Sequence, residues 1–180
     1  MASRSLGAAA AALVAALALI GCGSDSPNRP SDPADPLQAP GAAPVLPELR
    51  QVRSVTSGFQ DLGAAQAAGY STKLTECMSD PAGGMGFHYG KGAAIDAQVD
   101  LNEPEVLLYE PTAGGGLELV GVEYIVPLNA WAAATPPSLF GQTFHRNDAF
   151  GLWALHAWVW KANPSGVFAD WNPQVSCSAQ

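Results

Sequence analysis

Two apolar runs joined by a short flexible segment constrain the fold of this chain most strongly. Residues 105–110 and 117–127 are rich in β-branched, aromatic and aliphatic side chains, and the sequence Pro-Thr-Ala-Gly-Gly-Gly connects them. This pattern is typical of two antiparallel strands joined by a turn. The segment 105–127 therefore predicts a β-hairpin around which the rest of a domain is arranged.

The second run contains a carboxylate in an unusual position. Strand alternation places Glu123 on one face with Leu119, Gly121 and Ile125, and both faces are mainly apolar from residue 119 onward. We therefore expect a central strand. Burying a carboxylate there costs free energy unless a positive, metallic or hydrogen-bonding partner lies nearby. Glu123 is thus the first candidate functional residue.

One positive charge, Arg4, precedes an apolar run over residues 6–20 that is too short to span a bilayer, and the run ends in Leu-Ile-Gly-Cys. These first 22 residues resemble a bacterial lipoprotein signal peptide with its lipobox. The resemblance implies cleavage of residues 1–21 and acylation of Cys22, for instance with palmitate. It also implies a protein that is lipid-anchored to the membrane on the extracytoplasmic side of the bacterial cell envelope.

The composition changes after the expected cleavage site. Residues 23–47 contain seven prolines and few large aliphatic side chains, so they bury too little apolar area to offset the entropy of ordering. We expect residues 22–47 to be a disordered linker. Residues 48–180 are then long enough for a single globular domain with one core.

The charge balance excludes one class of partner. The chain has 8 Lys and Arg against 16 Asp and Glu, and removing residues 1–21 with Arg4 leaves 7 (8 − 1) against 16, a formal charge of −9. Nucleic acid is therefore not an expected partner. Membrane attachment is expected to depend on the acyl chains and not on the polypeptide surface.

The remaining patterns predict an α+β domain. Apolar residues recur at three- and four-residue spacing over residues 47–68, which predicts a helix, and strands are expected over residues 71–78, 86–90 and 152–161. The domain should therefore consist of one N-terminal helix packed on an antiparallel sheet of four or five strands. In the last strand, His156, Trp158 and Trp160 share one face, on which we expect the helix to pack.

A further resemblance rests on three short motifs. They are His-Tyr at residues 88–89, Leu-Leu-Tyr-Glu at 107–110 and Leu-Val-Gly-Val-Glu-Tyr-Ile at 119–125. Over Phe87 to Val126, the chain resembles the oil-body-associated protein family. Over the whole domain, including the ending Asn-Pro-Gln-Val-Ser-Cys, it resembles uncharacterised secreted bacterial lipoproteins. Neither resemblance implies an activity.

Two cysteines remain once Cys22 is acylated. Cys77 and Cys177 both lie in the expected folded domain, and an exported chain meets an oxidising environment. We therefore expect a disulfide bond between Cys77 and Cys177.

The chain has three histidines, His88, His145 and His156, all in segments expected to be ordered. Together with Glu123 they offer imidazole and carboxylate ligands that suit divalent zinc, copper, iron or manganese. We expect His88, Glu123 and His156 to face one pocket, with His145 on a loop near its mouth.

Glycines at positions 86, 90 and 121 flank these candidate ligands along their strands. A glycine in a strand often marks a place where another group approaches the backbone closely. We expect the three glycines to leave the space in which an ion or ligand lies beside His88 and Glu123.

Three functions are compatible with these features. The first is a small binding domain with a divalent-metal or small-ligand site, and the second is a structural or interaction lipoprotein whose polar residues serve the core. The third is an enzyme in which Glu123 acts as acid or base with a pKa raised by burial. It ranks last, because the chain lacks a Gly-x-Ser-x-Gly elbow, a phosphate loop, a dinucleotide-binding pattern and a Cys-x-x-Cys motif.

Overall fold

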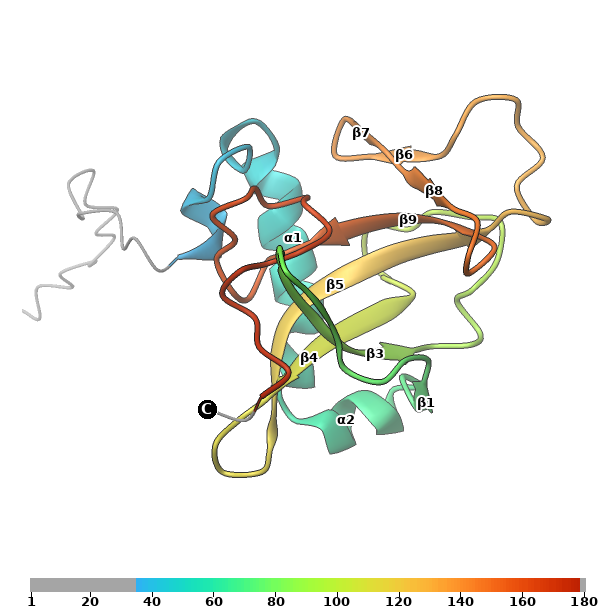
Figure 1. The fold of residues 1–180 in the computed structure, drawn as a ribbon. Helices are drawn as coiled ribbons and strands as arrows, with labels where there is room; N and C mark the ends of the chain where they lie inside the picture. The colour runs from blue at the N-terminus through green and yellow to red at the C-terminus, as the bar shows by residue number, and fades with distance from the viewer. Residues whose placement is uncertain (1–34, 179–180) are drawn as a thin grey trace, which may run out of the picture. The chain divides into compact units, whose positions relative to one another are not determined.

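A computed structural model describes residues 35–178 of the chain (Figure 1). The expected signal peptide at residues 1–21, the expected lipidation site Cys22 and the linker residues up to 34 lie outside the described residues. Within residues 35–178, no helix is long and apolar enough to cross a membrane.

The described residues form one α+β domain, as predicted. Its helices are α1 (Leu46–Thr56) and α2 (Leu62–Ala67), with 3-10 helices at Pro36–Gln38, Ala43–Val45 and Ser57–Gln60. Its strands are β1 (Thr72–Lys73), β2 (Met78–Asp80), β3 (Gly83–Gly90), β4 (Val106–Pro111), β5 (Leu117–Pro127), β6 (Ser138–Leu139), β7 (Gln142–Thr143), β8 (His145–Asn147) and β9 (Leu152–Ala157).

The main sheet is antiparallel and has seven strands, not the expected four or five. Its order is β1-β3-β4-β5-β9-β8, and β2 also pairs with β3, while β6 and β7 form a separate two-stranded ribbon. The additional strands β1, β2 and β8 have only two or three residues each. The single strand expected over residues 71–78 is wrong in detail. The structure has two short strands instead, with β1 near the start of this segment and β2 beginning at its end.

The predicted hairpin is confirmed as β4 and β5, and β5 is central because it pairs with β4 on one side and β9 on the other. A β-bulge interrupts the hairpin, because Leu108 lies opposite Gly121 whereas Tyr109 lies opposite Leu119. Val120 is therefore an extra residue, and the face alternation expected for the whole strand holds only from Gly121 onward.

Helix α1 covers one face of the sheet (Figure 1). Its buried Leu49 and Val52 belong to the same core cluster as Val122, Tyr124 and Leu155 from β5 and β9. Glu48 in its first turn and Arg53 in its last turn suit the helix dipole. The expected helix over residues 47–68 is divided, because residues 57–60 form a 3-10 turn and the Asp61 side chain caps α2.

The tryptophans are placed differently from the prediction. Trp158 belongs to a second core cluster with Val106 and Ile125, on the sheet face opposite to α1. Trp160 does contact the helix, and its indole N–H donates a hydrogen bond to Oγ1 of Thr56. The two side chains separate because β9 ends at residue 157 and not at 161, which ends the alternation.

The expected linker also needs correction where the structure describes it. Leu37 and Ala42 are buried in the core that α1 covers, and Arg53 forms an ion pair with Asp35 at 3.1 Å. Residues 35–47 therefore belong to the folded domain, whose expected start at residue 48 is too late.

The predicted disulfide between Cys77 and Cys177 is present. It closes a loop of 100 residues and ties the end of the chain to the residue that precedes β2. Val175, close to this bond in sequence, packs into the second core cluster, so the C-terminal segment helps to cover the sheet face opposite α1.

Candidate metal centre

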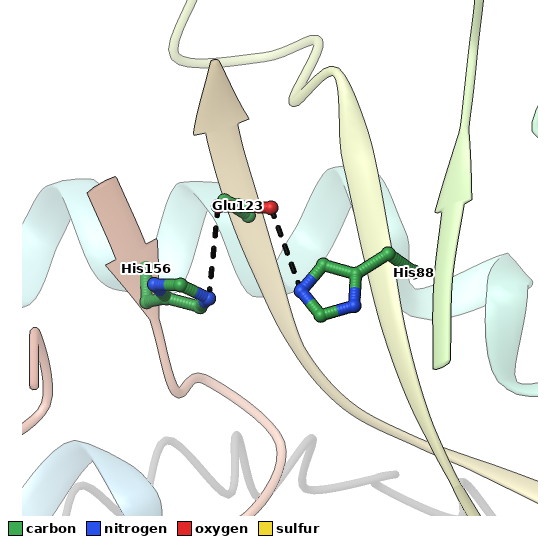
Figure 2. A group of neighbouring side chains, drawn as sticks. All are labelled: His88, Glu123 and His156. Atoms are coloured by element: carbon green, nitrogen blue, oxygen red, sulfur yellow. Dashed lines mark ion pairs between the residues drawn. The ribbon is translucent and has the colours of Figure 1, made fainter. Parts of the chain in front are cut away.

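The predicted convergence of His88, Glu123 and His156 is confirmed (Figure 2). Glu123 on β5 lies opposite His156 on β9, so the two side chains share a face. His88 on β3 lies opposite Leu108 of β4, which is opposite Gly121 of β5. The His88 side chain thus reaches Glu123 across β4, on the face that α1 does not cover.

The donor atoms of the three side chains point toward one another. Nε2 of His88 is 3.7 Å from Oε2 of Glu123, and Nε2 of His156 is 3.7 Å from Oε1 of the same carboxylate. All three side chains are at most 10% exposed. These separations are longer than a direct hydrogen bond, which spans about 2.7–3.2 Å.

Each imidazole has a further partner near its other nitrogen. Nδ1 of His88 shares a hydrogen bond of 2.8 Å with the hydroxyl of Thr75. Nδ1 of His156 is 3.4 Å from Oδ1 of Asp170, and the same oxygen lies 3.3 Å from Nδ1 of His145. Both histidines of the cluster are therefore oriented with Nε2 toward Glu123.

The surroundings shift the pKa values of the two histidines in opposite directions. Burial disfavours the charged form of His88 and lowers its pKa, and the attraction of Glu123 offsets this only in part. Burial also opposes protonation of His156, but Glu123 and Asp170 together outweigh it and raise the pKa. The neighbouring His156 in turn holds the pKa of Asp170 below its ordinary value.

This donor set could hold a divalent metal ion. Two donor atoms that each lie about 2.1 Å from a tetrahedral zinc ion are about 3.4 Å apart, and the donor atoms here all lie within 4.8 Å of one another. Both ring nitrogens of His156 are buried, and within residues 35–178 neither makes a hydrogen bond. A buried imidazole without a hydrogen bond is costly, and a metal ion at Nε2 would give one of the two nitrogens a partner.

The cluster opens into a cavity of about 740 Å³. His145 lines this cavity and is half-exposed, which agrees with its predicted place near the mouth, although it lies on the short strand β8 and not on a loop. His145 is not part of the cluster of three donors.

The three glycines do not provide the space that was expected. A Cβ on Gly86 would lie 2.3 Å from the carbonyl oxygen of Tyr109, and the space beside Gly90 is taken by the Leu74 side chain. Gly121 lies against the backbone of Ala157 and the ring of Trp158. These glycines permit close packing of the chain, and the cavity lies instead between residues 74–85 and 145–152.

Sequence reasoning missed Thr75 and Asp170. Thr75 lies between β1 and β2, where one strand was expected over residues 71–78, and Asp170 lies in a segment where no hydrophobic period indicates which way a side chain points. One signal was available for Asp170, since it is an acidic residue next to Trp171 in a segment that the Cys177 disulfide was expected to tie to the sheet.

Comparison of the chain with protein-family models, curated proteins and solved structures finds no match. The resemblance to the oil-body-associated protein family over Phe87 to Val126 therefore stays a prediction.

Proposed function

We propose that this domain binds a divalent first-row metal ion through Nε2 of His88, the carboxylate of Glu123 and Nε2 of His156. The observation that carries the proposal is the buried arrangement in which Nε2 of each histidine lies 3.7 Å from one of the two carboxylate oxygens of Glu123 (Figure 2). Two neutral imidazoles and one carboxylate leave a net charge of +1 on a bound divalent ion. Zinc, copper, iron and manganese all accept such ligands.

The residues behind the ligands support the same function. With Nε2 on a metal ion, Nδ1 of His88 carries the proton and its N–H donates a hydrogen bond to the Thr75 hydroxyl, and Nδ1 of His156 faces the Asp170 carboxylate. Such outer partners fix the tautomer and the ring orientation of metal-binding histidines. Three protein ligands also leave at least one coordination position for water or another ligand.

The cellular setting belongs to the proposal as well. The signal-peptide pattern ending at Cys22 supports a lipid-anchored protein that displays this domain on the extracytoplasmic side of the bacterial membrane. Replacing Cys22 with Ser, or adding the signal-peptidase inhibitor globomycin, is expected to leave the precursor uncleaved and without acyl-chain labelling. Normal processing under both conditions would reject the anchor without affecting the metal site.

Metal binding is tested by calorimetric titration of the unacylated mature chain, residues 22–180 with Cys22→Ser. Zinc and copper are expected to bind with one ion per chain and manganese more weakly, in keeping with the general order of divalent affinities. Glu123→Gln removes the charge but keeps the shape, and should lower zinc affinity at least about 100-fold. His88→Ala and His156→Ala should do the same.

Asp148→Asn is the matched control, because Asp148 lines the same cavity but pairs with Arg146 and is not one of the three donors. It should change zinc affinity by less than about threefold. If zinc and copper do not bind, or if Glu123→Gln binds them like the original chain, the cluster is a structural group of polar core residues. That result favours the structural or interaction lipoprotein, the second function compatible with the sequence.

A further inference from the structure

The cavity beside the metal site has mainly apolar walls. Its volume of about 740 Å³ lies in the range of small-molecule sites, about 300–1,000 Å³. The apolar side chains come from the segment before β3, from β3 itself, from the β3–β4 connection, from β5 and from the start of β9: Leu74, Met78, Met85, Ile95, Ile125 and Leu152. A ligand in this cavity would therefore contact hydrocarbon over most of its surface.

The exposed apolar side chains of the domain gather at this cavity. Among the residues that the structure describes, the large hydrophobic side chains left exposed are Leu74, at 41%, and Phe150, at 55%, and both line the cavity. Leu74 follows β1 and Phe150 precedes β9, so they belong to different walls. Two such residues at one opening mark an apolar surface for a ligand, in contrast to single exposed residues scattered over a protein.

Among the polar groups at the cavity, the metal ion is the place where an anionic ligand atom would bind. Arg146 and Asp148 pair with each other at 2.7 Å, and the Asp170 carboxylate lies between the imidazoles of His145 and His156. A divalent ion on Glu123 keeps a net charge of +1 and an open coordination position. An oxygen anion from a ligand would complete that coordination and neutralise the charge.

Building on the metal site proposed above, we propose that the cavity binds a small organic acid with an apolar body. Its carboxylate takes the open position on the metal ion, and its hydrocarbon part lies against Leu74, Ile125 and Phe150. Acids without an apolar body lack the wall contacts, and neutral apolar molecules lack the bond to the metal. Affinity should therefore require both parts of the ligand.

The test uses the unacylated mature chain loaded with cobalt, whose visible absorption responds to a change of ligand. Octanoate should alter the spectrum at a concentration lower than acetate by at least about tenfold, because only its tail removes apolar surface from water. Octan-1-ol, which has a tail of the same length without the carboxylate, should leave the spectrum unchanged. If octan-1-ol changed the cobalt spectrum as much as octanoate does, the proposed bond between the carboxylate and the metal ion would be contradicted.

Substitutions of the exposed apolar residues that line the cavity test where the hydrocarbon tail of octanoate lies. Phe150→Ala and Leu74→Ala should each weaken octanoate binding by about three- to tenfold, with acetate and cobalt binding unchanged. Phe150→Leu keeps an apolar side chain and should retain most of the affinity. A chain that binds cobalt but does not prefer octanoate over acetate overturns the ligand class alone, whereas a chain that binds no cobalt rejects the metal site as well.

Discussion

Glu123 on β5 lies directly opposite His156 on the neighbouring strand β9. In an antiparallel pair such residues point to the same face, with Cβ atoms about 4.5–5.5 Å apart. A shift of one residue in this register would turn one side chain to the opposite face, where α1 packs. The approach of the carboxylate to the imidazole is therefore a direct consequence of how the central strand pairs.

Asp170 should strengthen metal binding although it is not one of the three donors. Asp170→Asn keeps the size of the side chain but removes the negative charge 3.4 Å from Nδ1 of His156. Loss of such an outer partner typically costs about 10- to 100-fold in metal affinity, and calorimetric titration with zinc should show a loss in this range. Asp148→Asn is the matched control, because Asp148 lines the same cavity but pairs with Arg146. Equal effects of the two changes would mean that Asp170 acts only through overall charge.

Thr75 should orient His88 through its hydroxyl group. Thr75→Val keeps the shape of the side chain and removes the 2.8 Å hydrogen bond to Nδ1. Zinc affinity should fall by about tenfold, while the melting temperature without metal changes little, because the site is at the cavity wall. Thr75→Ser keeps the hydroxyl and should retain most of the affinity. If Thr75→Ser lost as much zinc affinity as Thr75→Val, the loss would have to come from altered packing and not from the missing hydroxyl.

Metal affinity should fall on acidification, and His156 should determine where the fall begins. The pKa of His156 is raised by Glu123 and Asp170, whereas burial lowers the pKa of His88, so protons compete with the metal at His156 first. Zinc affinity measured from pH 8 to pH 5 should decrease once the pH is below the pKa of His156. Asp170→Asn should move the onset to lower pH. An affinity that is constant over this range would exclude histidine ligands.

Glu105 should make the domain less stable as the pH rises toward 8. Its side chain is 2% exposed and accepts a hydrogen bond from the backbone N–H of Ile125, and burial raises its pKa to about 8. The folded state holds the proton more tightly than the unfolded state, so this contribution to stability is full below about pH 4.5 and is lost as the pH rises through 8.

Replacement of Glu105 by Gln separates this effect from other pH dependences. Glu105→Gln keeps an acceptor for Ile125 and removes the ionisation, so urea unfolding should show a smaller loss of stability between pH 5 and pH 8 than in the original chain. Glu118→Gln removes the same charge at an exposed position of β5 and should leave the pH dependence as it was. An unchanged pH profile in Glu105→Gln would show that this carboxyl does not titrate on unfolding.

The sequence was sufficient to predict the elements that have long regular patterns. The hairpin of residues 105–127 and the central place of Glu123 follow from alternation and from the flexible connection. The disulfide follows from cysteine number and expected export. Short strands gave no such signal, since β1, β2 and β8 have two or three residues each and their pairing depends on tertiary contacts.

The candidate site was predictable in its ligands but not in its surroundings. Histidine is rare in this chain, and a buried central carboxylate needs a partner, so His88 and His156 could be named with Glu123. Thr75 and Asp170 come from irregular segments whose positions are set by packing. The end of β9 at Ala157 also depends on tertiary contacts, which the hydrophobic pattern of the sequence does not indicate. After β9, the N–H groups of Trp160 and Lys161 both donate hydrogen bonds to the carbonyl of Val120.

A crystal structure of the unacylated mature chain soaked with zinc, with anomalous diffraction collected at the zinc edge, tests the metal site most directly. The site predicts one strong anomalous peak about 2.0–2.2 Å from Nε2 of His88, the carboxylate of Glu123 and Nε2 of His156, together with density for at least one non-protein ligand on the cavity side. The absence of a peak among these three side chains, or a peak found only between His145 and Asp170, would contradict it.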